Sequence, residues 1–343
     1  MNEEFDKLNL PDSHYLKIAK NSGSIYFDEF LEAMNRLKDI IPDKDFKTFW
    51  NDKLQLNKPV FNEKGFIQGA CEIAVANYFG NKNDFKVEAK VNPKNKKDVD
   101  TQFTSNGFTY NIEVKCAASN AKEKVEKSDS FKFQTLGRFD NKDEVIDILS
   151  KALDEGLTNQ GKPLKEHAEL KNMDNNLKDF LESAHEKFNS DCSESEINIL
   201  LIGCNDKADM QSWVGYLTAS AGLFTNESYS NQDDFKNVDI VVLTNLYFKH
   251  KDFSEKEVEN SWSLTETLNL SIVNPFRGKD KKDGILNFNN EIINYNSEIS
   301  QFIVLGNIDV PQEVKEAVRI PHFVIDYLEI EKGKYLFEKK PTK

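Results

Sequence analysis

The sequence lacks the short motifs that mark several large classes of enzyme. It contains no GxxxxGK[ST] or GxGxxG segment, so nucleotide hydrolysis by a phosphate-binding loop and dinucleotide binding have no support. The GxSxG segment of serine hydrolases is also missing. Histidine is scarce and shows no HxxxH or HExxH spacing; the five residues are His14, His167, His185, His250 and His322. A histidine-based nuclease or metalloprotease is therefore disfavoured.

Cysteine and long apolar runs are scarce as well. Cys71, Cys116, Cys192 and Cys204 form no CxxC pair, which predicts reduced core thiols rather than disulfides or a zinc site. No apolar stretch approaches the length of a membrane span. The first six residues are acidic and lack the segments of a signal peptide. We therefore expect a soluble cytoplasmic protein with no membrane partner.

Acidic residues outnumber basic ones over the chain as a whole. The 343 residues include 58 Asp and Glu and 45 Lys and Arg, a formal net charge of −13, which argues against a generic nucleic-acid binder. Residues 82–138 differ, because 12 Lys and Arg stand there against 8 Asp and Glu, a balance of +4. This window fits either a basic face for a phosphate-bearing substrate or a solvated lysine-rich loop.

Helical patterns dominate the first 80 residues. Apolar residues at three-and-four spacing predict an amphipathic helix over 27–41 and a shorter one near 46–50. A further helix is predicted over 62–80, apolar around most of its circumference, with Glu72 in its middle. A buried carboxylate needs a hydrogen-bond partner, a counter-charge or a metal. Glu72 is therefore either a site residue or an ordinary salt-bridge partner at the edge of the apolar face.

Two strands joined by a tight turn form the most informative stretch. Residues 98–103 and 110–117 alternate apolar and polar side chains, and Asn106-Gly107 is a strong hairpin signal because both residues tolerate a positive φ. The period of two places Glu113 and Lys115 on one face of the second strand. The residues that share a face of the first strand are Asp98, Asp100 and Gln102. Such a group of acids with one lysine can hold a divalent metal beside a water.

Further strands and helices complete an α/β pattern. The other predicted strands are 85–91, 197–203, 239–244 and 302–305, and the later helices are 145–157 and 177–188. We predict an α/β fold in which helices flank a central mixed sheet of at least four strands.

The order of these elements resembles the PD-(D/E)xK, or restriction-endonuclease-like, nuclease superfamily. The resemblance rests on Asp98-Val99-Asp100, on Ile112-Glu113-Val114-Lys115 and on Glu72 of the preceding helix, and it covers residues 61–205. It implies a restriction-endonuclease-like core within residues 61–250. Residues 1–60 form an N-terminal helical section, and residues 251–343 form a C-terminal extension, separate from the core or continuous with it.

By position, the resemblance also implies roles for these residues. Asp100 and Glu113 would bind a metal, Lys115 would orient the attacking water, and Glu72 would complete the metal shell directly or through a water. Mg²⁺, with Mn²⁺ as a substitute, suits an all-oxygen site. The implied activity is endonucleolytic hydrolysis of DNA, in restriction or anti-phage defence. The implied partners are DNA and a second copy of the chain or another subunit of a defence complex.

Departures from the family pattern leave alternatives open. The Pro-Asp pair is absent, since Pro93 lies well before Asp100. Asp98 faces the same side as Asp100, which is preferred because its neighbours place it inside the strand. Gln134 resembles an extra glutamine of some branches, and a plain surface amide is the alternative. The whole set also fits a non-catalytic relative that binds nucleic acid or a partner protein, or edge-strand charges that discourage aggregation.

Overall fold

Six strands form one mixed sheet. The computed structural model describes residues 1–116, 128–133, 142–169, 173–228, 230–256, 259–305 and 311–338. In sheet order the strands are β1 (Asn83–Ala89), β2 (Val99–Ser105), β3 (Phe108–Cys116), β6 (Glu196–Gly203), β7 (Ile240–Thr244) and β8 (Asn269–Val273). β1, β2 and β3 are antiparallel, β6 and β7 are parallel to β3, and β8 is antiparallel to β7. The predicted α/β class with a central mixed sheet flanked by helices is confirmed.

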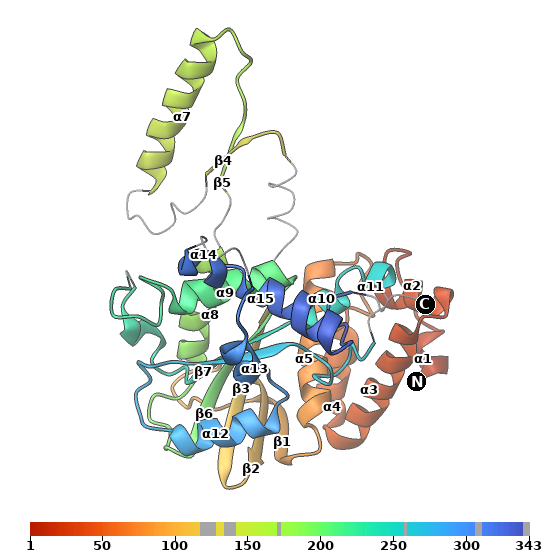
Figure 1. The fold of residues 1–343 in the computed structure, drawn as a ribbon. Coiled ribbons are helices and arrows are strands. Elements are labelled where there is room, and N and C mark those ends of the chain that lie inside the picture. Colours follow the sequence, from red (N-terminus) through yellow and green to blue (C-terminus); the bar gives the residue numbers. More distant parts are fainter. Residues whose placement is uncertain are drawn as a thin grey trace.

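Helix α5 packs on one face of this sheet, and the N-terminal helices pack against α5 (Figure 1). The elements are α1 (Asn2–Phe5), α2 (Tyr15–Ser22), α3 (Ile25–Ile40), α4 (Asp43–Thr48), the π-helical turn η1 (Phe49–Lys53) and α5 (Glu63–Phe79). Asn62 is the N-cap of α5, and its side chain accepts a hydrogen bond from the Gly65 backbone amide. Phe30 of α3, Phe66 of α5 and Val114 of β3 belong to one buried apolar cluster.

The other face of the sheet is covered by α8 (Met173–Lys187), α9 (Lys207–Thr218) and the π-helical η4 (Phe323–Glu331). β6 is apolar over most of its length and is buried on both sides. Its residues alternate, because Ile199 and Leu201 join the α5 cluster while Leu200 and Ile202 join the α8 cluster.

A small lobe stands away from the rest of the molecule (Figure 1). It consists of α7 (Lys142–Asn159) and a two-stranded parallel sheet of β4 (Phe131–Phe133) and β5 (His167–Glu169). In the chain it lies between β3 and α8. None of its described residues belongs to either buried cluster, so the lobe contributes nothing to the core around the main sheet.

The last third of the chain adds a strand and short helices. The helices are η3 (Gln232–Phe235), α10 (Leu246–His250), α11 (Phe253–Lys256), α12 (Lys282–Glu291), α13 (Asn296–Gln301), α14 (Gln312–Glu316) and α15 (Arg319–His322). β8 pairs with β7 along its whole length, so the section after residue 250 contributes one strand to the main sheet.

The strand predicted at 302–305 is wrong. These residues follow α13 without joining either sheet, and Ile303 and Leu305 are 76% and 93% exposed. A short apolar run does not by itself identify a strand. The strand of this region is β8, where Leu270 and Ile272 alternate with polar residues.

Two expectations drawn from scarce features can be compared with the structure. All four cysteines are buried free thiols, as predicted. Among the described helices, none has the length and apolar character needed to cross a membrane.

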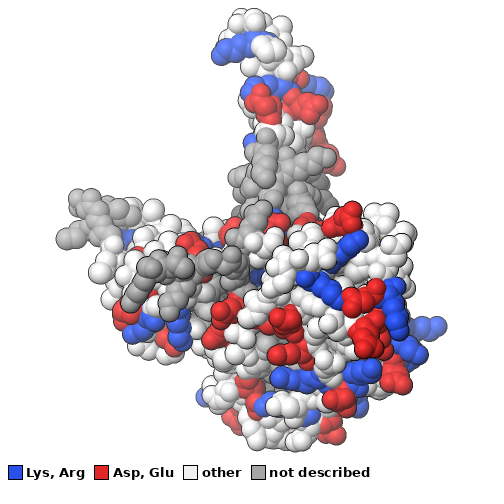
Figure 2. Space-filling model, turned by 90° about the vertical axis from the view of Figure 1, so that its right-hand side faces the viewer, with Lys and Arg blue, Asp and Glu red and all other residues white. Residues whose placement is uncertain are grey.

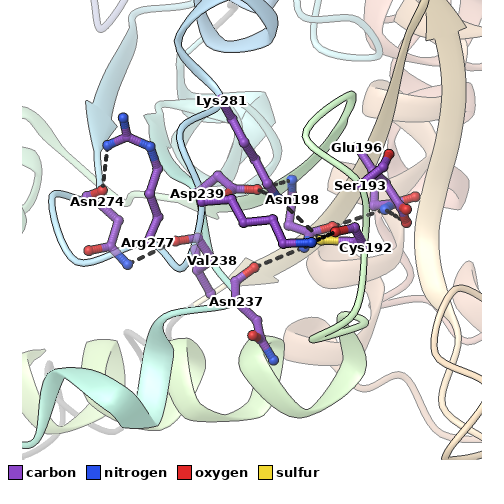
Figure 3. A network of polar contacts seen from close by, with 12 residues as sticks. Cys192, Ser193, Glu196, Asn198, Asn237, Val238, Asp239, Asn274, Arg277 and Lys281 are labelled. Atoms are coloured by element: carbon purple, nitrogen blue, oxygen red, sulfur yellow. Dashed lines mark hydrogen bonds and ion pairs between the residues drawn. The ribbon is translucent and has the colours of Figure 1, made fainter.

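A buried polar network joins the starts of β6 and β7 to the segment before α12 (Figure 3). Lys281 Nζ lies 2.7 Å from Asp239 Oδ2 and 3.3 Å from Cys192 Sγ. Asp239 Oδ2 also accepts a hydrogen bond of 2.7 Å from the Asn198 amide, and Asn274 donates to the Val238 carbonyl. The side chains of Lys281 and Asp239 are almost fully buried. Their ion pair connects the segment before α12 to the starts of β6 and β7.

Candidate metal centre

The β2–β3 hairpin opens at the point where its acids lie. Asn106 and Gly107 have φ values of 50° and 83°, as the predicted tight turn requires. Pairing runs from the turn to Thr101 and Ile112 and ends there. Beyond that pair, Asp100 Oδ2 accepts a hydrogen bond of 2.7 Å from the Val114 amide. The carboxylate thus bonds to a backbone group of the neighbouring strand, which leaves its Oδ1 for another partner.

Helix α5 brings Glu72 to the same place. Glu72 is 5% exposed, and its Oε1 accepts a hydrogen bond of 2.7 Å from Gln68 Nε2, one helical turn earlier. The same Gln68 nitrogen lies 2.9 Å from the Val114 carbonyl oxygen, which fixes α5 to β3. As at Asp100, one carboxylate oxygen is held by a neutral donor and the other, Oε2, is left for a cation.

A third acid, Glu88, comes from β1. The pairs Val87–Thr101 and Ala89–Val99 place it opposite Asp100 across the β1–β2 ladder. Like charges directly opposite destabilise a sheet, and the backbone of Glu88 has a φ of 48°, in the left-handed region that favours glycine. Glu72, Glu88 and Asp100 each offer one oxygen within 4.8 Å of the other two. We call these three residues the acid cage.

The ammonium group of Lys53 lies in the acid cage. Its Nζ is 2.6 Å from Glu72 Oε2, 2.6 Å from Glu88 Oε1 and 3.7 Å from Asp100 Oδ1. Lys53 is the last residue of η1, and its backbone packs directly against Gly69 of α5. A Cβ built on Gly69 would stand 2.5 Å from the Lys53 carbonyl oxygen, so a glycine is required for this contact.

Glu113 forms a second cluster beside the cage. Its side chain is fully buried, and its Oε1 lies 2.7 Å from Lys115 Nζ and 2.6 Å from Lys187 Nζ of α8. Glu113 Oε2 is buried and has no hydrogen-bond partner among the described residues. Asp100 lies near both clusters. The charges of Glu113 and Lys187, as well as that of Lys53, therefore affect its pKa.

Burial and repulsion between neighbouring carboxylates raise the pKa values of Glu72 and Asp100. Burial, together with the charge of Asp100, raises the pKa of Glu72 to about 7 against the opposing effect of Lys53. Burial and the charge of Glu113 raise the pKa of Asp100 to about 7 as well. These carboxyls therefore lack enough positive charge around them near neutral pH, a condition that a divalent cation would remedy.

The pKa values of Lys53 and Lys115 are also raised, which favours the charged form of both side chains. Burial alone would lower the pKa of Lys53 and of Lys115, but the neighbouring carboxylates outweigh it and raise both pKa values above the ordinary range. Glu72 and Asp100 act on Lys53, and Glu113 acts most on Lys115. Both side chains are therefore ammonium ions at neutral pH, donors of positive charge and of hydrogen bonds rather than proton acceptors.

The acid cage fits a hard divalent cation. Its donors are all carboxylate oxygens, which Mg²⁺ and Mn²⁺ prefer, and opposite ligands on Mg²⁺ lie roughly 4.2 Å apart. The three cage oxygens lie within 4.8 Å of one another, close enough for side-chain movement to bring them onto one ion. The ligands that fit one ion best are Glu72, Glu88 and Asp100, with Glu113 beside them.

The structure brings together four of the residues that the sequence predicted, namely Glu72, Asp100, Glu113 and Lys115. Asp98 precedes β2, is half-buried, and is not one of the cage residues. Gln134 lies outside the described residues.

Sequence reasoning missed Lys53, Glu88 and Lys187. Only Glu88 had a local signal, since it lies on a predicted strand beside the hairpin.

Part of the positive charge of the basic window is compensated by acids. Lys82, Lys94 and Lys97, from the basic window of residues 82–138, are ion-paired with Glu291, Asp191 and Glu186. On the face shown in Figure 2, Lys and Arg side chains alternate with Asp and Glu. Charge alone therefore does not define a nucleic-acid surface there.

Comparisons with protein-family models, with curated proteins and with solved structures give no match for this chain.

Proposed function

We propose that this protein is a Mg²⁺-dependent endonuclease of the PD-(D/E)xK type that hydrolyses DNA phosphodiester bonds. One observation carries the proposal: Glu72 of α5 and Asp100 of β2 lie together at the open end of the hairpin, where Asp100 bonds to the Val114 amide between Glu113 and Lys115 of β3. The order of α5, β1, β2, β3, α8 and β6 in the chain, with β6 parallel to β3, supports it.

Each residue has a role that its surroundings support. Glu72 and Asp100 would hold the metal through Oε2 and Oδ1, the oxygens not used by Gln68 and Val114. A bound Mg²⁺ would lower the pKa of a water and offset charge on the scissile phosphate. Lys115, an ammonium held by Glu113, would donate to the attacking water or to a phosphate oxygen as negative charge develops. Lys187 shares Glu113 and adds a second positive charge.

The reaction forms a bond from the water oxygen to phosphorus and breaks a phosphorus–oxygen ester bond. The water loses one proton to solvent, and the leaving oxygen gains one. A free-standing nuclease of this kind suits restriction or anti-phage defence in the cytoplasm. Cleavage of both DNA strands needs two sites, which a second copy of the chain or a partner subunit would supply.

Cleavage of supercoiled plasmid tests the proposal. With Mg²⁺ or Mn²⁺, the wild-type protein should nick or linearise the plasmid. Glu113→Gln and Lys115→Met should each slow cleavage by on the order of 100-fold or more, and EDTA should stop it. Wild-type rates in both folded variants would refute the assignment.

Asp239→Asn is the matched control. It alters an equally buried, ion-paired carboxylate that lies two strands away from β3. This variant should lose stability yet keep the cleavage rate of its folded fraction, which separates damage to the site from damage to the fold.

A second function is favoured by the position of Lys53. An ammonium that already neutralises part of the acid cage is what a non-catalytic relative would need in place of a metal. Such a protein would bind nucleic acid or a partner protein without cleaving. Calorimetry that shows DNA binding but no uptake of Mg²⁺ or Mn²⁺ would favour this function over the nuclease.

A further inference from the structure

The three cage oxygens that face Lys53 accept no hydrogen bond from any other donor among the described residues. Gln68 holds the other oxygen of Glu72, and the Val114 amide holds the other oxygen of Asp100. Lys53 Nζ lies 2.6 Å from Glu72 Oε2, 2.6 Å from Glu88 Oε1 and 3.7 Å from Asp100 Oδ1. A metal ion bound by the cage would take these same oxygens, so the ammonium and the metal exclude one another.

Charge also favours an exchange of cations. Three carboxylates enclose a single ammonium. One positive charge is thus too little for this cage. A divalent ion supplies twice the charge at the same position and accepts all three oxygens as ligands.

Lys53 has a route out of the cage. Its side chain is 23% exposed, whereas Glu72 is 7% and Asp100 10% exposed when only side chains are compared. The lysine backbone is fixed by its contact with Gly69 and by the fully buried Leu54 that follows. The flexible four-carbon stem can therefore swing the ammonium towards water while the backbone remains in place.

We propose that Lys53 is an exchangeable internal counter-ion: it holds the metal position in the metal-free protein, and a divalent cation binds by displacing it, with Glu88 as the third carboxylate ligand. This inference rests on the proposed function, because it concerns the same site. It adds Glu88 to the metal ligands. It also gives the N-terminal section, through Lys53, a direct part in metal binding.

Amine labelling of the full wild-type protein tests the displacement directly. With Mn²⁺ as the probe, the ε-amine of Lys53 should react faster with an acylating reagent than in EDTA, measured site by site by mass spectrometry. Lys281, which is ion-paired outside the cage, should react equally in both conditions. Unchanged or slower labelling of Lys53 at saturating Mn²⁺ would overturn the proposal.

Mn²⁺ affinity, measured by calorimetry, tests the competition. Lys53→Met should bind Mn²⁺ on the order of tenfold more tightly than wild type, because the competing cation is gone. Glu88→Gln should bind more weakly than wild type. Lys281→Met, which removes a comparable ion-paired ammonium elsewhere, should leave the affinity unchanged. Equal or weaker binding by folded Lys53→Met would show that Lys53 is not a competitor.

These readouts separate the two proposals. Displacement of Lys53 by Mn²⁺ without any DNA cleavage would support the exchange and refute the nuclease. Cleavage with no change in Lys53 labelling would support the nuclease and refute the exchange. A protein that takes up no Mn²⁺, with or without Lys53, would refute both.

Discussion

The carboxylate of Glu113 is the most enclosed charge in the site. It is fully buried and shares one oxygen between two ammonium groups, at 2.7 Å from Lys115 and 2.6 Å from Lys187. Removing one partner of a buried ion pair costs about 3–5 kcal/mol, because the other charge is left uncompensated. Variants at Glu113 therefore change stability as well as chemistry, and the amide is a better probe than alanine.

His250 makes the stability of the folded protein depend on pH. It is fully buried, its Nδ1 is 2.8 Å from the Tyr26 hydroxyl, and burial followed by the charge of Lys249 lowers its pKa to about 3. An unfolded histidine titrates near 6.5. Below about pH 6.5 the unfolded chain therefore binds a proton that the folded protein does not, and stability falls as the pH falls towards 3.

Urea unfolding at pH 7.5 and pH 5 measures this effect. His250 should account for a loss of about 2 kcal/mol in unfolding free energy between these pH values. His250→Gln, which cannot titrate, should lose that much less than wild type over the same interval. An identical pH dependence in the two proteins would show that His250 has the same pKa in the folded and unfolded states, which would contradict the effect of burial.

At the residue scale, the sequence predicted the parts of the site that belong to consecutive elements. Glu113 and Lys115 follow from the period of a strand, and Glu72 from a charge on an apolar helix. Lys53 and Lys187 could not be found, because no local pattern distinguishes a lysine that reaches a distant acid from one in solvent. Both positions depend on how η1 and α8 pack, which is a property of the whole fold.

Among the elements, α5 and η1 depend on a close contact at Gly69. Gly69→Ala should destabilise the protein by about 1–3 kcal/mol, although alanine is the better helix former, because the new Cβ would meet the Lys53 backbone at 2.5–2.8 Å. Thermal or urea unfolding measures the change. Stabilisation by this substitution would contradict the close packing of the two elements.

Gly156 of α7 is the matched control. A Cβ added there meets no atom within 4 Å, so Gly156→Ala should be neutral or stabilise α7 by up to about 1 kcal/mol.

The element scale also shows where sequence patterns succeed and fail. The β2–β3 hairpin was predictable because turn chemistry and alternation agree at Asn106-Gly107. Residues 302–305 have the composition of a strand, yet two of their apolar side chains face solvent. β8 has weaker local signals and forms because β7 offers it a partner, and pairing of this kind is not encoded within five residues.

At the scale of the whole molecule, residues 1–60 share a buried apolar core with α5 and the sheet. Among their side chains in this cluster are Phe5, Tyr26, Phe27, Phe30, Met34 and Phe49. Each fully buried large apolar side chain contributes about 1.5–3 kcal/mol, and total stability is only about 5–15 kcal/mol.

Deletion of residues 1–60 should therefore leave a chain that does not fold. We expect no cooperative thermal transition and no near-ultraviolet circular dichroism from residues 61–343. Replacing the α7 lobe, residues 128–169, by a short linker is the control of similar size, and it should preserve the transition because the lobe lies outside both clusters. A cooperative transition in the 61–343 fragment would show that residues 1–60 are a separate domain.

The position of Lys53 has a consequence for biosynthesis. Chains are made from the N-terminus, and Lys53 precedes Glu72, Glu88 and Asp100. Every cage carboxylate is therefore added to a nascent chain that already carries its counter-ion. The newly made protein can form the acid cage before any metal arrives, so its folding does not depend on the supply of metal in the cell.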